Sequence, residues 1–125
     1  MSKTQALRTA VTARLKELCP RVYYGQAKSK TERPYIVYTL EQIDQADDLC
    51  TLELEANIVD YGQDTGPAED LSDAVMASFD RFYYLDDVIQ FSTYPTRQQP
   101  VPEEDRSVIR RRLLIEIHLH ERRTV

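Results

Sequence analysis

The last part of the chain shows the clearest alternation of apolar and polar residues. Between Ile109 and Leu119 every second residue except Arg111 is a large aliphatic, and the residues between these positions are mostly polar or charged. A repeat of two residues is typical of a strand with one buried face. The run Ser107–Glu121 spans about fifteen residues, whereas a usual strand has roughly five or six. The pattern therefore predicts a long central strand.

The beginning of the chain has a helical repeat instead. Between Thr4 and Leu18, apolar residues recur at the spacing of one helical stripe, which favours an amphipathic helix. Ser2 or Thr4 offers a side chain that can cap the first turn. Pro20 lacks a backbone N–H and disfavours helical geometry at the preceding residue, so we predict that the helix stops there.

A second helix is predicted after the turn at residues 62–67. Gly66 is expected to be its N-cap and Pro67 its first helical residue, a position that suits proline. An apolar stripe then runs over Leu71–Phe82 and includes two phenylalanines. The tyrosine pair Tyr83–Tyr84 is expected to close this helix.

Four further segments are typical of strands because they alternate or are rich in β-branched and aromatic residues. They are Arg21–Tyr24, Tyr35–Gln42, Thr51–Tyr61 and Asp86–Phe91. The second and third are expected to form a hairpin across the acidic connection Asp44–Asp48. Two stretches without periodicity, Gln26–Arg33 and Tyr94–Asp105, are predicted as loops, the second either functional or disordered.

The pattern as a whole predicts a single α+β domain over residues 1–125. We expect a mostly antiparallel sheet with two helices packed on one face, in the order α-β-β-β-α-β-β. The other face would then be free of helices. If the two longest strands are neighbours, glutamates of one can pair with arginines of the other. A long sheet with one bare face is incomplete as a monomer, so we predict a subunit interface there, made by Glu53, Glu55, Val59, Tyr61, Arg110, Arg112, Leu114 and Glu116.

Composition narrows the class of protein. The net charge of −5 argues against a general nucleic-acid binder, which usually carries a basic excess. The chain holds no apolar run near the roughly 20 residues of a membrane span, and its first residues lack the apolar segment of a signal peptide. We expect a soluble protein made in the cytoplasm. Cys19 and Cys50 form no motif and are expected to be reduced, buried thiols.

No catalytic constellation is recognisable. The only histidines, His118 and His120, share one face of the last strand, and no second pair of metal ligands has a recognisable spacing. A serine nucleophile would need one of these histidines as its base. The adjacent carboxylates lie in predicted loops or strand starts, where solvation is their usual role. We therefore expect no enzyme activity, no metal and no cofactor.

The order of these segments resembles the small tail-completion, tail-terminator and neck proteins of long-tailed bacteriophages and prophages. The resemblance spans nearly the whole chain and rests on the order of patterns rather than on one short motif. The segments that carry it are Val22–Gly25, Pro34–Leu40, Leu54–Gly62, Leu71–Phe82 and Arg112–Glu121.

The resemblance implies a non-enzymatic structural protein of the virion head–tail junction, made in the bacterial host cytoplasm. Such proteins form homohexameric rings that end the tail tube and receive the head connector, and the free protein can be a monomer before assembly. Tube and connector contacts are then expected in the two predicted loops, at Lys28, Lys30, Arg33, Arg97, Gln98, Gln99, Glu103 and Glu104.

Three alternatives remain open at this point. The chain is alternatively another neck or minor capsid component of the same kind. It is alternatively a bacterial adaptor domain that binds its partner along a sheet edge. The third alternative is a small enzyme whose site forms only at an oligomer interface, for which the chain offers no pair of base and nucleophile.

Overall fold

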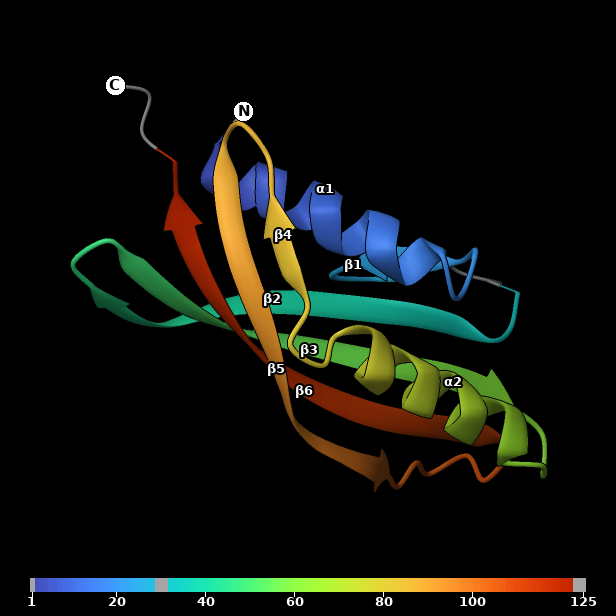
Figure 1. The fold of residues 1–125 in the computed structure, drawn as a ribbon. Coiled ribbons are helices and arrows are strands. Elements are labelled where there is room, and N and C mark those ends of the chain that lie inside the picture. Colours follow the sequence, from blue (N-terminus) through green and yellow to red (C-terminus); the bar gives the residue numbers. More distant parts are fainter. Residues whose placement is uncertain (1, 29–31, 123–125) are drawn as a thin grey trace.

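The computed structural model describes residues 2–28 and 32–122 and is an α+β domain. Two helices accompany a six-stranded, mostly antiparallel sheet that curls along its length (Figure 1). The elements follow one another as α-β-β-β-α-β-β-β, so the structure adds one strand to the predicted order.

The first helix, α1, spans Lys3–Lys16 and confirms that the start of the chain is helical, but it ends before Leu18, which is exposed, rather than at Pro20. Ser2 caps it by accepting a hydrogen bond from the backbone N–H of Gln5, and the Gln5 side chain accepts one from the N–H of Ser2. This reciprocal capping box satisfies two N–H groups that a helix start leaves free. The stripe that packs inward consists of Ala6, Leu7, Ala10, Val11 and Leu15.

The sheet has the strand order β1-β2-β3-β6-β5-β4. Its strands are β1 (Val22–Tyr24), β2 (Tyr35–Ala46), β3 (Leu49–Tyr61), β4 (Tyr83–Leu85), β5 (Ile89–Val101) and β6 (Val108–Glu121). β1 runs parallel to β2, and all other neighbours are antiparallel. The predicted β2–β3 hairpin and the long central strand β6 are both confirmed.

The second helix, α2, covers Gly66–Ser78 and is shorter than predicted. Thr65 is its cap residue, so Gly66 lies inside the helix rather than at the N-cap. The expected extension to Phe82 is wrong because Arg81 has a positive φ of 52°, which ends a right-handed helix. Phe82 still packs against the core, with its ring centroid 5.8 Å from that of Phe91. Its apolar side chain fits the spacing of the helical stripe, but it packs there from a residue that follows the helix.

The tyrosine pair that was expected to close α2 instead belongs to β4, and the predicted loop Tyr94–Asp105 is mostly strand. β5 continues to Val101, with an irregularity between Pro95 and Arg97. β4 pairs with β5 only at residues 90–92, so the rest of β5 is an outer edge. An edge tolerates proline because one side of the strand needs no N–H donors. The prolines of this segment therefore led to the wrong prediction of a loop.

The acidic connection between β2 and β3 is also shorter than predicted. β2 continues through Ala46 past an irregularity between Gln42 and Asp44, and Asp47 turns the chain with a φ of 52°. The result is a long hairpin whose end projects from the body of the molecule (Figure 1).

Both helices lie on the same side of the sheet (Figure 1). Their inward residues join alternate residues of the strands in one core, where Leu54, Ile58, Ile115 and Ile117 are fully buried. Tyr38 links this core to α1, because its hydroxyl lies 2.6 Å from Thr12 Oγ1. The opposite side of the sheet carries no helix and is called the helix-free face below.

Candidate functional site: the helix-free face

The helix-free face brings the predicted interface residues together across the two central strands. In the β3–β6 register, Glu53 is opposite Glu116, Glu55 is opposite Leu114 and Val59 is opposite Arg110. Arg112 and Tyr61 occupy the neighbouring positions of the same face, opposite Asn57 and Val108 respectively. The eight predicted side chains therefore form one continuous surface.

A row of glutamates crosses this face near the hairpin. Glu41 of β2 is opposite Glu53 of β3, which in turn is opposite Glu116 of β6. Like charges that face each other across strands destabilise a sheet. The side chain of His118 lies nearby, with Nε2 3.4 Å from Glu116 Oε1, a contact that is an ion pair when the imidazole is protonated. This row gives one end of the face an acidic character.

The other end of the face carries an arginine pair, Arg110 and Arg112. Arg110 Nε lies 2.7 Å from Glu103 Oε1, and Arg112 Nε lies 3.5 Å from Glu55 Oε1. Neither N–H group points along its contact, so these are ion pairs rather than aligned hydrogen bonds. The Arg112 pair confirms that a glutamate of one central strand meets an arginine of the other. The face is therefore polar along the strands, acidic at one end and basic at the other.

Between the two ends the face is hollowed by a cavity of about 400 Å³. Asn57 lines it with only 8% of its surface exposed, and its Nδ2 donates to Glu55 Oε2 at 3.0 Å while its Oδ1 has no partner among the described residues. Burial, followed by the neighbouring Tyr61, raises the pKa of Tyr35 above its usual value. Also on this face, Val59 is 2% exposed. The remaining lining residues are Gly25, Gln26, Ala27, Val37, Thr39 and Arg110.

Two of the predicted partner-contact residues lie against this same face. The Arg33 guanidinium sits 4.1 Å from the centroid of the Tyr61 ring, and Glu103 pairs with Arg110. Arg33 and Glu103, one from each predicted loop, thus lie against the predicted interface. Lys28 and Glu104 are exposed, and Lys30 lies outside the described residues.

Three further partner-contact residues, predicted in a loop, lie in β5. Gln99 is opposite Arg112, and Arg97 is opposite Leu114. Gln98 accepts a hydrogen bond from Arg111 Nη2 at 3.0 Å and donates one to Asp73 Oδ1 at 3.3 Å. The pairing of β5 with β6 therefore holds these three residues in fixed positions, a support that residues of a loop would lack.

Sequence reasoning missed three apolar side chains on the helix-free face. Tyr94 is opposite Glu116, while Tyr83 is opposite Ser92 and Leu85 is opposite Gln90. Their exposed fractions are 38%, 58% and 51% respectively. Residues alternate between the two faces along β4 and β5, and this alternation could have placed the three side chains. It was overlooked because the prolines suggested a loop and the tyrosine pair was assigned to the end of a helix.

Residues 2–28 and 32–122 contain no group of three or more His, Cys, Asp or Glu side chains that could hold a metal ion. Cys19 and Cys50 are free and buried. In the same ranges, no helix is both long enough and apolar enough to span a membrane.

No protein-family model matches the chain, and no curated protein matches its sequence.

Proposed function

We propose that the chain is a non-enzymatic structural protein of a bacteriophage or prophage, a ring-forming tail-terminator or tail-completion subunit at the head–tail junction. The observation that carries this proposal is the helix-free face. It is a wide surface without a helix layer, with exposed tyrosines at its sides and charges of opposite sign at its ends. Such a surface suits a protein partner better than a small substrate.

The charge arrangement favours association between identical copies. The acidic row Glu41–Glu53–Glu116 and the arginine pair Arg110–Arg112 lie at different places on one subunit. The row of one copy can attract the arginines of a second copy, which would then exchange their ion pairs with Glu103 and Glu55 for contacts with the partner. A contact between two different patches repeats head to tail, and it closes into a ring when the rotation between subunits allows it. The helix-free face is then one half of the contact between neighbours.

The assignment to a phage tail rests on the order of segments along the sequence. That resemblance supplies the tail-tube and head-connector proteins as partners and places the subunit in the virion. Lys28, Lys30, Arg33, Glu103 and Glu104 remain the proposed contacts with these partners, together with the β5 residues Arg97, Gln98 and Gln99. The chain assembles from monomers made in the host cytoplasm and needs no cofactor.

A second candidate, an adaptor domain that binds an extended peptide, is favoured by one observation. β1 pairs with β2 only at residues 36–38, so the outer edge of Thr39–Ala46 is unpaired among the described strands. A partner strand can add to such an edge through backbone hydrogen bonds.

The deciding experiment is the solution mass by light scattering across concentration, followed by negative-stain imaging with purified tail tubes. The proposal expects rings, either free or formed on the tube end. A chain that stays monomeric and ignores tube ends at high concentration contradicts it. Saturable binding of an extended peptide by that monomer would support the adaptor.

A further inference from the structure

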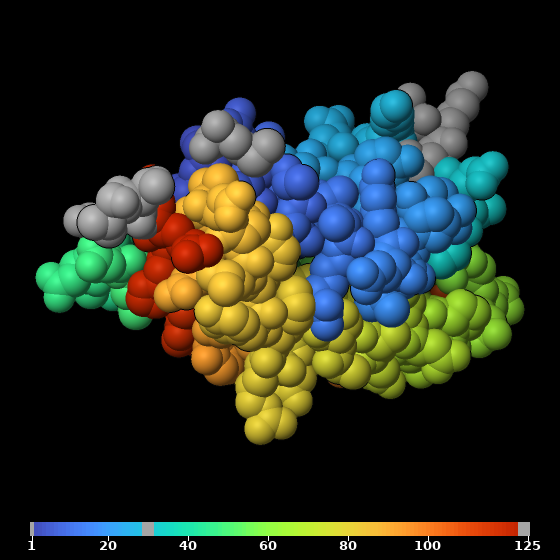
Figure 2. Space-filling model, turned by 45° about the horizontal axis from the view of Figure 1, so that its top comes forward, coloured from blue at the N-terminus to red at the C-terminus, as the bar shows by residue number. Residues whose placement is uncertain are grey.

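The end of the β2–β3 hairpin is an acidic projection with one apolar side chain. We call residues 41–48 the hairpin tip. All of them are exposed, and four of the eight carry carboxylates: Glu41, Asp44, Asp47 and Asp48. Ile43 falls in the irregularity of β2, where 52% of its surface is exposed. The tip stands away from the body of the molecule, at the left of the space-filling view (Figure 2).

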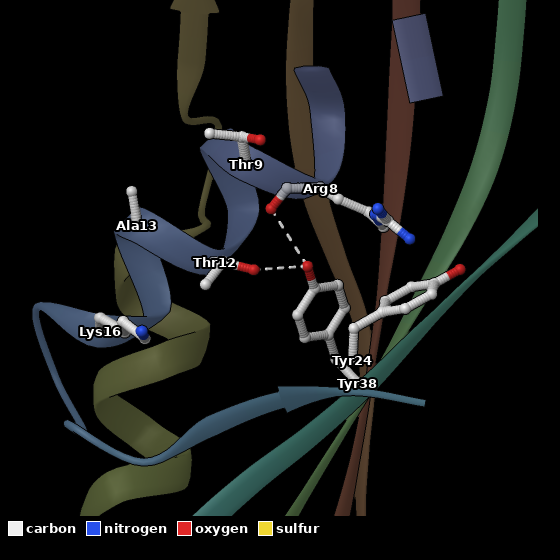
Figure 3. Close-up of a pocket in the computed structure, with 7 residues that line it drawn as sticks. All are labelled: Arg8, Thr9, Thr12, Ala13, Lys16, Tyr24 and Tyr38. Atoms are coloured by element: carbon white, nitrogen blue, oxygen red, sulfur yellow. Dashed lines mark hydrogen bonds between the residues drawn. The ribbon is translucent and has the colours of Figure 1, made fainter. Parts of the chain in front are cut away.

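A shallow groove of opposite character lies between α1 and the β1 edge of the sheet. This α1 groove encloses about 570 Å³. Its lining includes two cations, Arg8 and Lys16, and no carboxylate among the described residues. Ala13 and Tyr24 add exposed apolar surface to this lining, and the fully buried Tyr38 forms its floor (Figure 3). The lining is completed by Thr9 and Thr12.

The floor of the groove is held in place by contacts within the subunit. The Tyr38 hydroxyl lies 2.6 Å from Thr12 Oγ1 and donates to the backbone carbonyl of Arg8 at 3.1 Å (Figure 3). The Arg8 guanidinium lies 4.8 Å from the centroid of the Tyr24 ring. A surface that is already ordered loses little conformational freedom when a partner binds, which favours affinity.

We propose that the hairpin tip of one copy docks into the α1 groove of the next copy. Ile43 would rest on Ala13 and Tyr24, with Glu41 and Asp44 directed toward the two cations. The hairpin tip thus offers an apolar side chain among negative charges, and the α1 groove offers apolar surface beside positive charges. This inference rests on the proposed assembly of identical copies and adds a contact on the helix side of the sheet to the one proposed for the helix-free face.

The hairpin tip cannot dock into the α1 groove of its own chain. Asp47 and Asp48 line a small hollow together with Lys3, at the start of α1. Lys16 lies at the far end of the same helix, which at about 1.5 Å per residue places it roughly 20 Å from Lys3. The contact therefore joins two subunits through different patches, which is the head-to-tail arrangement that builds rings.

The hairpin also borders the helix-free face, because Glu41 belongs both to the tip and to the glutamate row. A neighbour that receives the tip beside α1 would therefore meet the adjoining part of this face as well. Glu41 is therefore shared between the tip contact and the glutamate row, whereas Ile43 and Ala13 report on the tip contact alone.

Cross-linking between two separately substituted proteins tests the contact. Full-length Ile43→Cys and Ala13→Cys variants are mixed and treated with a short bis-maleimide reagent, and the control pair is Ile43→Cys with Asp70→Cys on the exposed side of α2. The native Cys19 and Cys50 are buried, and unsubstituted protein reports any reaction at them. We expect the first pair to give a mixed dimer in at least roughly tenfold higher yield than the control.

Charge reversal with rescue provides a second, independent readout. Lys16→Glu and Asp44→Lys, each alone, should raise the concentration needed for assembly by roughly tenfold or more, because like charges then meet across the contact. A mixture of the two variants should restore assembly at the Lys16–Asp44 contact, where opposite charges meet again. Asp70→Lys changes charge equally outside the contact and should assemble as the unsubstituted chain does.

The outcomes separate this inference from the proposed function. Rings that form normally from Lys16→Glu and from Asp44→Lys, with no preferred 43–13 cross-link, overturn the docking contact and leave the ring proposal intact. An unsubstituted chain that stays monomeric and does not assemble on tail tubes overturns both. Assembly of the variants only as a mixture, together with the specific cross-link, supports the contact.

Discussion

Glu103 and Arg110 lie on the two sides of the turn that joins β5 to β6, and their side chains meet with 2.7 Å between Oε1 and Nε. Glu103 is a predicted partner-contact residue and Arg110 a predicted interface residue. Their pairing holds the β5–β6 turn against the helix-free face and neutralises one arginine of the pair. A partner that binds Arg110 must therefore displace Glu103 or bind around it.

This ion pair should contribute little to stability. About a third of each side chain is exposed, 37% for Arg110 and 31% for Glu103, and exposed pairs contribute about 0.2–1 kcal/mol. We expect Glu103→Gln to lower the free energy of unfolding by less than about 1 kcal/mol, as measured by urea denaturation. A double-mutant cycle with Arg110→Gln isolates the coupling between the two side chains. A coupling of zero would show that the ion pair does not hold the turn.

Tyr38 should stabilise the packing of α1 on the sheet through its hydroxyl. Tyr38→Phe keeps the ring but removes the contacts with Thr12 Oγ1 and the Arg8 carbonyl, so we expect a loss of about 1 kcal/mol in the free energy of unfolding. Chemical denaturation at neutral pH measures it. Thr9→Ala on the exposed side of α1 is the control, and an equal loss in both variants would contradict a specific role for Tyr38.

The same residue should make the protein sensitive to alkali. Burial raises the pKa of Tyr38 above its usual value of 10.0 in the folded chain. The folded state then keeps a proton that the unfolded chain releases, so the free energy of unfolding falls as pH rises from 10.0 through the raised pKa. Tyr38→Phe lacks this contribution and should lose less stability over that range. Parallel pH profiles of the two proteins would contradict the shifted titration.

Asp86 organises the turn between β4 and β5. Its Oδ1 accepts hydrogen bonds from the backbone N–H groups of Val88 at 2.7 Å and Ile89 at 2.9 Å, and its Oδ2 accepts one from the Tyr84 hydroxyl at 2.7 Å. We expect Asp86→Ala to lower the free energy of unfolding by about 1–2 kcal/mol because these donors lose their acceptor. Asp86→Asn retains an oxygen for the backbone and should be milder.

Acid should weaken the same turn. The Ile89 N–H, and after it the Tyr84 hydroxyl, hold the pKa of Asp86 below 3.8 in the folded chain. The stabilisation is present above pH 3.8 and is lost as pH falls through the lowered pKa, because the unfolded chain takes up the proton first. Asp86→Asn cannot titrate and should show a flatter acid profile. An unchanged profile would mean that this carboxylate does not govern acid sensitivity.

The sequence predicted those elements whose side chains repeat regularly. The alternation in β3 and β6 placed Leu54 and Ile115 in the core and Glu55 and Arg112 on the opposite face, because a strand allows only these two directions. The same alternation collected the predicted interface residues on one surface. Whether that surface contacts a second copy is not encoded in the pattern.

The elements that sequence reasoning misplaced depend on tertiary context. Pro95 and Pro100 are acceptable in β5 because its outer edge is unpaired beyond the short β4, and no local signal reveals which strand lies at an edge. Phe82 has the right spacing for α2, but Arg81 turns the chain before it. The α1 groove joins residues of α1 to Tyr24 and Tyr38, and this proximity exists only in the folded chain.

Two adjacent residues of β6 offer the sharpest test of how the sheet faces are assigned. Ile115 is fully buried in the core, whereas Leu114 is half-buried on the helix-free face. Ile115→Asp would bury an unpaired carboxylate and cost more than about 4 kcal/mol, a large part of the roughly 5–15 kcal/mol that stabilises a domain. We expect this variant to show no cooperative thermal unfolding by circular dichroism.

Leu114→Asp makes the same chemical change one position away and should give a different result. Leu114 is half-buried, so an aspartate at this position keeps contact with water. Its like-charge pair with the opposite Glu55 destabilises the sheet, but by less than a fully buried, unpaired carboxylate does, so the variant should fold and melt cooperatively. Its self-association should weaken, because an apolar side chain is lost from the proposed contact. A soluble, cooperatively melting Ile115→Asp protein beside an unfolded Leu114→Asp protein would show that the two faces are reversed, and the proposed interface would then have to lie on the other side of the sheet.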